Sequence, residues 1–129
     1  MIALDTSAII AILRHEPDAE RFIEAIASAP RRLIGRPTEV ELHIVMQAKA
    51  GREPIDALIA RFLQTVERVD FGEAHLAAAT AAFDRFGKGR HPASLNYGDC
   101  MAYAVASVAG CPLLYKGEDF ARTDIRSAL

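Results

Sequence analysis

Short apolar runs alternate along this chain with longer segments in which apolar residues recur at helical spacing. The first run, Ile2 to Leu4, stops at Asp5, and a helical pattern follows from Thr6 to Arg14. Further strands are expected at 32–34, 65–69 and 112–115, and further helices between Pro17 and Pro30, from Pro37 to Gly51, from Pro54 to Leu63, from Gly72 to Phe86 and from Cys100 to Ala109. This alternation predicts an α/β fold, with a mostly parallel central sheet flanked by helices on both faces. The tail, 123–129, is a candidate edge strand.

The composition is that of a globular protein with a core of its own. The chain has 129 residues, of which 51% are hydrophobic and 25% charged, and we expect a single domain spanning residues 1–129. No apolar run approaches the roughly 20 residues that span a bilayer, and the N-terminus has no basic segment typical of a signal peptide. We therefore expect a cytoplasmic protein without membrane contact. Cys100 and Cys111 lack metal-ligand spacing and are expected to be buried, reduced thiols.

Basic residues gather in a few places although the chain as a whole is weakly acidic. The net charge of −2 argues against binding nucleic acid through overall charge, but it permits a local basic strip. Lys88 and Arg90 lie in a glycine-rich loop, 87–92, that we expect to be exposed, and Lys116 is a possible neighbour in space. A solvated surface without a ligand is the alternative interpretation.

Acidic residues are placed where strands end and helices begin. Asp5 ends the first strand, Glu39 and Glu41 open the helix after the second, and Glu118 and Asp119 follow the last. In a parallel sheet these positions share one edge, where ligands of such folds bind. Asp99 begins the helix before the last strand, and topology alone does not bring it to that edge.

A cluster of carboxylates would need a cation. Each acid taken singly has a structural explanation, such as a favourable position at a helix N-terminus. Packed together, carboxylates repel and their pKa values rise unless a cation neutralises them, and Mg²⁺ or Mn²⁺ suits oxygen ligands best. Glu39 and Glu41 lie about 200° apart around a helix, so only one can face the cluster, and spacing does not choose between them. The sequence contains no HExxH, GxSxG, P-loop or GxGxxG motif.

Three segments together resemble a known family. Ile-Ala-Leu-Asp-Thr-Ser-Ala-Ile-Ile at 2–10, Asn-Tyr-Gly-Asp-Cys at 96–100 and Leu-Leu-Tyr-Lys-Gly-Glu-Asp-Phe at 113–120 resemble the PIN-domain ribonucleases of the VapC type. These are toxins of bacterial type II toxin–antitoxin systems. The resemblance covers essentially the whole chain and implies a PIN-like α/β domain.

The resemblance also implies a site. The family hydrolyses RNA with about four acids around Mg²⁺ or Mn²⁺ ions, and by position Asp5, Glu41 and Asp99 match three of them. Asp119 fits the fourth place best, while Glu118 and Asp124 stay possible. The implied chemistry is metal-assisted endoribonucleolytic hydrolysis, with Asp5 and Asp99 as metal ligands. Thr6 resembles the hydroxyl residue that supports the metal site.

The resemblance further implies partners. Lys88, Arg90 and Lys116 are candidates for contacting the RNA backbone, and a VapB-like antitoxin and a homodimer are expected. Two wide apolar stripes also suggest a dimer; their residues are Phe22, Ile23 and Ile26 in one and Ile55, Leu58, Ile59 and Phe62 in the other. A receiver-like phosphoacceptor domain is disfavoured because no acids pair before Asp5. A catalytically inactive PIN fold that only binds protein or RNA is the more serious alternative.

Overall fold

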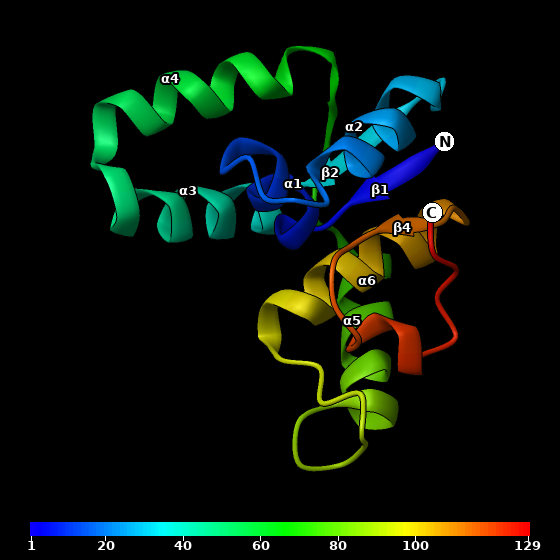
Figure 1. Ribbon diagram of the computed structural model, residues 1–129. Helices are drawn as coiled ribbons and strands as arrows, with labels where there is room; N and C mark the ends of the chain where they lie inside the picture. Colours follow the sequence, from blue (N-terminus) through cyan, green and yellow to red (C-terminus); the bar gives the residue numbers. More distant parts are fainter.

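The computed structural model describes residues 1–129, except for the side chains of 49 and 50. In chain order its elements are β1 (Ile2–Leu4), α1 (Thr6–Leu13), α2 (Ala19–Ser28), β2 (Arg32–Gly35), α3 (Arg36–Ala50), α4 (Arg52–Phe62), the 3₁₀ turn η1 (Leu63–Thr65), β3 (Glu67–Val69), α5 (Glu73–Phe86), α6 (Tyr97–Ala109), β4 (Leu113–Leu114) and the 3₁₀ turn η2 (Phe120–Arg122). Figure 1 shows the strands at the centre with helices around them. The predicted α/β class is confirmed.

The four strands form one parallel sheet in the order β3-β2-β1-β4. Ala3 lies opposite Leu33 on one side and Leu113 on the other. The C-terminal tail adds a single parallel bridge between Leu113 and Ser127 rather than a full edge strand. Because β1 is central and short, the residue after it, Asp5, lies at the middle of the carboxyl edge.

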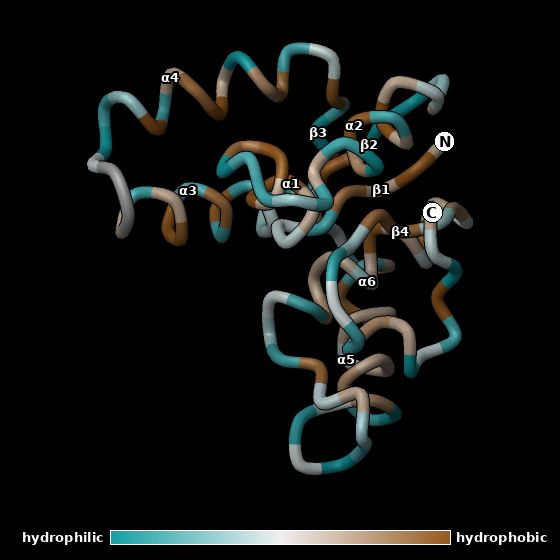
Figure 2. Tube along the Cα trace, in the orientation of Figure 1, coloured by the Kyte–Doolittle hydropathy of each residue, from teal (hydrophilic) through white to brown (hydrophobic). Residues whose placement is uncertain are grey.

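Alternate strand residues face two separate hydrophobic cores. Ala3 and Leu33 belong to a core shared with α5 and α6, whereas Leu4 and Ile34 belong to a core shared with α1, α2, α3 and α4. This is the period of two expected of strands buried on both faces. In Figure 2, β1 is hydrophobic along most of its length. The prediction that helices cover both faces is therefore confirmed.

Local capping moves several helix boundaries from their predicted places. The second helix begins at Ala19 rather than at Pro17, because residues 14–18 form a turn in which the Ala19 N–H donates to the Glu16 carbonyl. The helix predicted from Cys100 starts at Tyr97, since the Asn96 side chain caps it. The fourth helix starts at Arg52, and residues 120–122 form a 3₁₀ turn that the pattern did not predict.

The two apolar stripes that suggested a dimer mostly cover the core of their own chain. Phe22, Ile55 and Ile59 are buried, while Ile23 is 49% exposed. Leu58 of the second stripe is also 38% exposed. Each stripe thus leaves one exposed apolar side chain, and the homodimer stays a prediction. No helix in the described part of the chain has both the length and the apolar character needed to cross a bilayer. Both cysteines are free and buried, as predicted.

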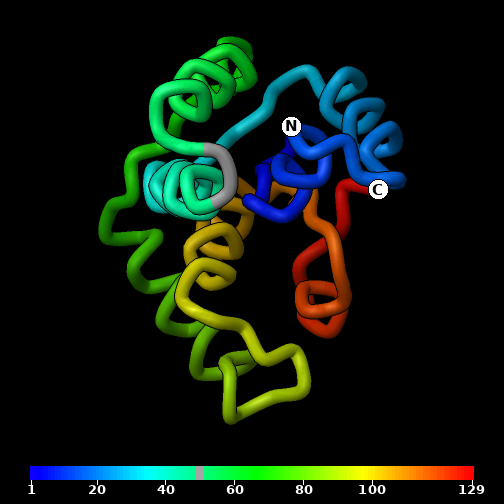
Figure 3. Tube along the Cα trace, turned by 60° about the vertical axis from the view of Figure 1, so that its left-hand side comes forward, coloured from blue at the N-terminus to red at the C-terminus, as the bar shows by residue number. Residues whose placement is uncertain are grey.

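The loop between α5 and α6 projects from one end of the molecule. Figures 1 and 3 both show it extending away from the sheet. A bridge between Gly87 and Leu95 closes its base, and Lys88 and Arg90 are exposed on it. The predicted exposed basic loop is confirmed.

Candidate active site

Asp5 is a buried carboxylate at the N-terminus of a helix. It caps α1, and its Oδ2 accepts hydrogen bonds from the Ser7 backbone N–H at 3.0 Å and from the Ser7 hydroxyl at 2.6 Å. Only 4% of Asp5 is exposed. Its pKa is raised to about 6, chiefly by burial; the Ser7 hydrogen bonds partly offset this rise, and the charges of Asp99 and Glu41 add to it.

Glu41 meets the first helix through the residue that follows Asp5. The buried Thr6 hydroxyl donates to Glu41 Oε1 at 2.5 Å, although the two residues are 35 positions apart. Thr6 thereby holds the α3 carboxylate beside the end of β1. Thr6 thus contacts one of the acids of the candidate site, and its role in supporting a metal stays a prediction.

Asp99 completes a capping box with Asn96 and also belongs to the cluster of acids. Its backbone N–H donates to Asn96 Oδ1 at 2.9 Å, and its Oδ2 accepts from the Asn96 N–H at 3.0 Å. Burial raises the pKa of Asp99, and the charges of Asp119 and Glu41 raise it further. The capping role and the clustered position, weighed above as alternatives, therefore coexist in one residue.

Among the three candidates for a fourth acid, Asp119 is the one whose charge affects the pKa of another acid of the cluster. It is exposed, precedes η2, and its charge raises the pKa of Asp99. Asp124 instead accepts hydrogen bonds from the Tyr103 hydroxyl at 2.6 Å and from Arg85 at 3.3 Å. Glu118 is exposed and is not among the groups that shift the pKa of Asp5 or Asp99.

Glu39 points into a separate ion-pair network. Its carboxylate lies 3.2 Å from Arg36 Nη1 and 3.1 Å from Arg68 Nε. The two helical glutamates thus occupy opposite sides of α3, as the 200° rotation requires, and the structure places Glu41 on the side of Asp5 and Asp99.

The three basic candidates differ in how far they are already engaged. Lys116 Nζ donates to Glu16 at 2.5 Å and to Asp18 at 3.0 Å, and these contacts raise its pKa. Arg90 lies 3.7 Å from Asp84 in a loose, exposed pair. Lys88 is exposed on the same loop, so Lys88 and Arg90 are better placed than Lys116 to meet a ligand.

Ser7 is a site residue that pattern analysis passed over. Besides donating to Asp5, its hydroxyl accepts from the Lys116 backbone N–H at 2.9 Å across 109 positions of sequence. It therefore ties Asp5 to the loop that bears Asp119. The available signal was its spacing, since a hydroxyl two residues after a capping aspartate is placed to bond that carboxylate.

Comparisons with known proteins show which family the chain belongs to. The family model of the PIN domain matches residues 2–126. The chain belongs to the PIN-domain family. It is 44% identical to Ribonuclease VapC30 of Mycobacterium tuberculosis, over 96% of this chain and 95% of the relative. It is likewise 44% identical to Ribonuclease VapC of Mycolicibacterium smegmatis, over 96% of this chain and 97% of the relative.

Solved structures show the same fold at low identity. This PIN domain superposes on DNA-bound VapBC from Salmonella typhimurium with a TM-score of 0.79 and 18% identity, over 98% and 94% of the two chains. Against VapC20 of Mycobacterium tuberculosis, described as a Sarcin-Ricin loop cleaving toxin, the TM-score is 0.77 with 17% identity, over 97% and 96%. The predicted resemblance to VapC-type PIN domains is confirmed.

The PIN-domain carboxylates fit a divalent cation by their chemistry. In each of the three acids, one carboxylate oxygen accepts a hydrogen bond: Asp5 from Ser7, Glu41 from Thr6 and Asp99 from Asn96. The second oxygen of each carboxylate accepts none of these bonds. Among the described residues, no three acids, histidines or cysteines already stand at coordinating distance. The donors are all oxygens and their charges repel, which suits Mg²⁺ or Mn²⁺.

Proposed function

We propose that this chain is the toxin of a type II toxin–antitoxin pair, a cytoplasmic endoribonuclease that hydrolyses RNA phosphodiesters. The observation that supports this most is a cluster of four acids from different elements: Asp5, Glu41, Asp99 and Asp119. They lie near enough for the charges of some to raise the pKa values of Asp5 and Asp99. The ribonuclease names of relatives at 44% identity support the same reaction. All four acids are assigned as catalytic.

Asp5 and Asp99 would hold Mg²⁺ or Mn²⁺, with Glu41 and Asp119 completing the charge. When bound, the ion would lower the pKa of a water molecule, orient the phosphate and stabilise its developing charge. A cation is also required for substrate binding, because bare carboxylates repel an RNA phosphate. We therefore propose a metal-dependent enzyme.

The protein's own groups orient these carboxylates. Ser7 holds one oxygen of Asp5, and Thr6 holds one oxygen of Glu41. The backbone N–H of Asn96 holds one oxygen of Asp99. Three acids are thus fixed before any ligand arrives, which lowers the cost of ordering the site during the reaction.

We propose that Lys88 and Arg90 contact the RNA backbone, as positioning rather than sequence-reading contacts. Both are exposed on the projecting loop. For Lys116 we propose a different role, since Glu16 and Asp18 already occupy its ammonium group. It secures the loop that bears Asp119.

A catalytically inactive PIN fold that only binds RNA or protein is the alternative. The decisive experiment is a cleavage assay on total RNA, with the purified chain treated with EDTA and then supplied with Mg²⁺ or Mn²⁺. We expect cleavage only after the metal is restored. RNA binding without cleavage at any metal concentration would support the inactive module instead.

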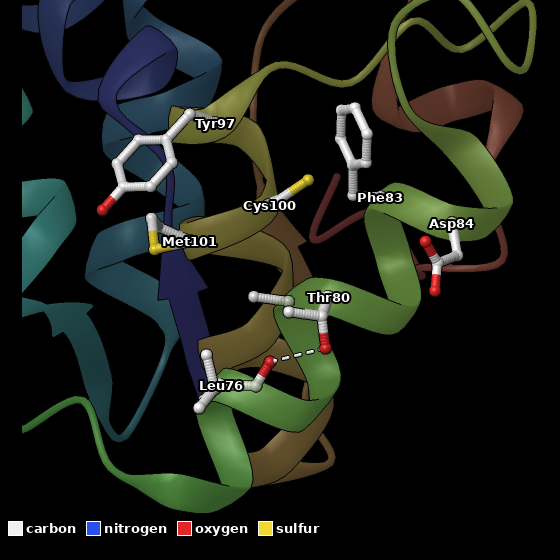
Figure 4. Close-up of a pocket in the computed structure, with 8 residues that line it drawn as sticks. Leu76, Thr80, Phe83, Asp84, Tyr97, Cys100 and Met101 are labelled. Atoms are coloured by element: carbon white, nitrogen blue, oxygen red, sulfur yellow. Dashed lines mark hydrogen bonds between the residues drawn. The ribbon is translucent and has the colours of Figure 1, made fainter.

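We propose a homodimer through a face different from the one the sequence suggested. Exposed apolar side chains lie on α3, α5 and α6; they are Val40 (57%), Ile44 (65%), Leu76 (58%), Phe83 (37%) and Tyr97 (77%). A hollow of about 390 Å³ lies between α5 and α6, lined by residues that include Leu76, Phe83 and Tyr97 (Figure 4). Such a surface is unusual for a monomer, and a second copy would cover it.

We also propose a VapB-like antitoxin as partner. Neighbouring folds were solved as toxin–antitoxin complexes, among them VapBC2 from Rickettsia felis. An arginine of the partner would suit an acidic site best, because its guanidinium stays charged and pairs with carboxylates in a two-pronged geometry. We propose that such an arginine enters the carboxylate cluster.

A further inference from the structure

Gly98 occupies a helical position at which glycine has no backbone advantage. It lies in the first turn of α6, directly before Asp99, and its φ is not in the left-handed region. Glycine is a poor helix former, so its presence here calls for a reason other than backbone conformation. The surroundings of its Cα supply that reason.

The space beside the Gly98 Cα is filled by the Glu41 carboxylate. A Cβ at this position would overlap Glu41 Oε2, and it would lie 2.7 Å from Cδ and 3.2 Å from Oε1. Both distances are shorter than ordinary van der Waals contact. The carboxylate therefore lies against the α6 backbone, in a place that any side chain at residue 98 would take.

The other side of the same carboxylate is held by Thr6. The Thr6 hydroxyl donates to Oε1 at 2.5 Å, while Oε2 faces Gly98. Glu41 is thus enclosed between α1 and α6, and its charge acts on both Asp5 and Asp99. A side chain at residue 98 would displace the carboxylate by rotating a flexible glutamate, so the fold would survive while the site changed.

We infer that Gly98 is a positioning residue, whose missing side chain leaves the room in which the Glu41 carboxylate completes the acidic site. This inference rests on the proposed function for its effect on cleavage. Its structural content, that Gly98 sets the place of Glu41, stands apart from it. The two parts can therefore be tested separately.

The activity test compares two glycine-to-alanine variants. Gly98→Ala should lower the cleavage rate about 100-fold, the loss expected when a reacting group is misplaced by about 1 Å. Gly72→Ala is the matched control, because Gly72 also lies at a helix N-terminus but a Cβ there meets nothing within 4 Å. It should keep full activity. Wild-type cleavage by a folded Gly98→Ala variant would overturn the inference.

A second test needs no catalysis. The melting temperature is measured for wild type, Gly98→Ala, Glu41→Ala and the double variant, without metal. With Glu41 present, the added methyl group meets the carboxylate, so Gly98→Ala should lower the melting temperature or leave it unchanged. With Glu41 removed, the same change should raise it, because alanine is the better helix former.

Equal shifts in the two backgrounds would overturn the positioning role, whatever the enzyme does. If the wild-type chain cleaves no RNA while the melting shifts still differ between backgrounds, the proposed function fails and the positioning of Glu41 stands. Calorimetric titration with Mn²⁺ alone adds an independent readout. Gly98→Ala should weaken binding in the presence of Glu41 and change nothing in its absence, and equal weakening in both backgrounds would count against the inference.

Discussion

Asp5 is the residue at which burial and charge conflict most. Its carboxyl is almost entirely covered, and burial raises its pKa from 3.8 to about 6. An acid whose pKa is raised on folding binds its proton more tightly in the folded state. Without metal, its contribution to stability therefore falls as the pH rises from about 4 to about 6 and stays low above that.

Replacing Asp5 by asparagine should separate function from stability. Asp5→Asn should abolish cleavage, because the proposed metal ligand is lost, while asparagine still caps the helix. In EDTA at pH 7.5 the variant should be more stable than wild type by up to about 3 kcal/mol, two pKa units at about 1.4 kcal/mol each. The gain should vanish near pH 4. Thermal melts at the two pH values measure it, and full cleavage by the folded variant would refute the assignment. Asp99→Asn should likewise abolish cleavage.

The two glutamates of α3 should respond very differently to the same substitution. Glu41→Gln should lower the cleavage rate at least about 10-fold, since it removes a charge from the cluster. Glu39→Gln should leave the rate within about twofold and lower stability by less than about 1 kcal/mol, because it only weakens ion pairs with Arg36 and Arg68, whose side chains are partly exposed. Initial rates and melts of both variants test this. Equal losses of activity would show that Glu41 has no special place.

At the scale of elements, the loops after the strands bring the acids together and are tied to one another. Ser7, at the start of α1, accepts the backbone N–H of Lys116 after β4. The Lys116 side chain then reaches Glu16 and Asp18 in the turn between α1 and α2. Two loops at the carboxyl edge are thereby fixed to each other, and Asp119 follows the second of them.

The basic residues should divide into two groups when RNA binding is measured. In an inactive Asp99→Asn background, Lys88→Ala and Arg90→Ala should each weaken binding of a short RNA. Each should also reduce the salt slope, the slope of the logarithm of the binding constant against the logarithm of the salt concentration, by about one. Lys116→Ala should lower the melting temperature and leave the salt slope unchanged. Fluorescence anisotropy across a salt series distinguishes these effects. A full unit of slope lost with Lys116→Ala would show that it binds phosphate despite its ion pairs.

At the scale of the whole molecule, we propose that two surfaces bind a partner. The apolar face over α3, α5 and α6 should meet a second copy, and light scattering at micromolar concentration should give twice the 14.0 kDa of one chain. Ile44→Glu should yield a folded monomer, because Ile44 is 65% exposed on that face. Ile23→Glu, 49% exposed on α2, is the control. A monomeric wild type, or a dimer that Ile44→Glu leaves intact, would contradict the proposed face.

The acidic site should be blocked by a small protein from the same operon. Co-expression and co-purification should recover it, and the complex should not cleave RNA. Changing to alanine the partner arginine nearest to Asp5, Glu41 and Asp99 should restore cleavage at least in part. If inhibition survives the loss of every basic residue near the acids, the block is steric and the proposed ion pairing is wrong.

Much of the fold was determined by local pattern in the sequence. The apolar run before Asp5, the alternating strands and helices and the three familiar segments sufficed for the parallel sheet, the covered faces and the PIN family. These features depend on neighbours close in sequence, since periodicity and turn chemistry act over a few residues. Helix starts were less predictable, because the Asn96 capping box and the turn before Ala19 shifted them by a few positions.

Tertiary structure alone decided how the site is assembled. Glu41 is distinguished from Glu39 by its contact with Thr6, 35 residues away. Asp124 bonds to Tyr103 and Arg85, which favours Asp119 over it as the fourth acid. Lys116 pairs with Glu16 and Asp18, which favours Lys88 and Arg90 over it as RNA contacts. The apolar stripes on α2 and α4 mostly cover their own core, with Ile23 and Leu58 exposed. These outcomes depend on how the helices and loops pack around the sheet. Contacts between residues distant in the chain set that packing, and the period of a local pattern contains no information about it.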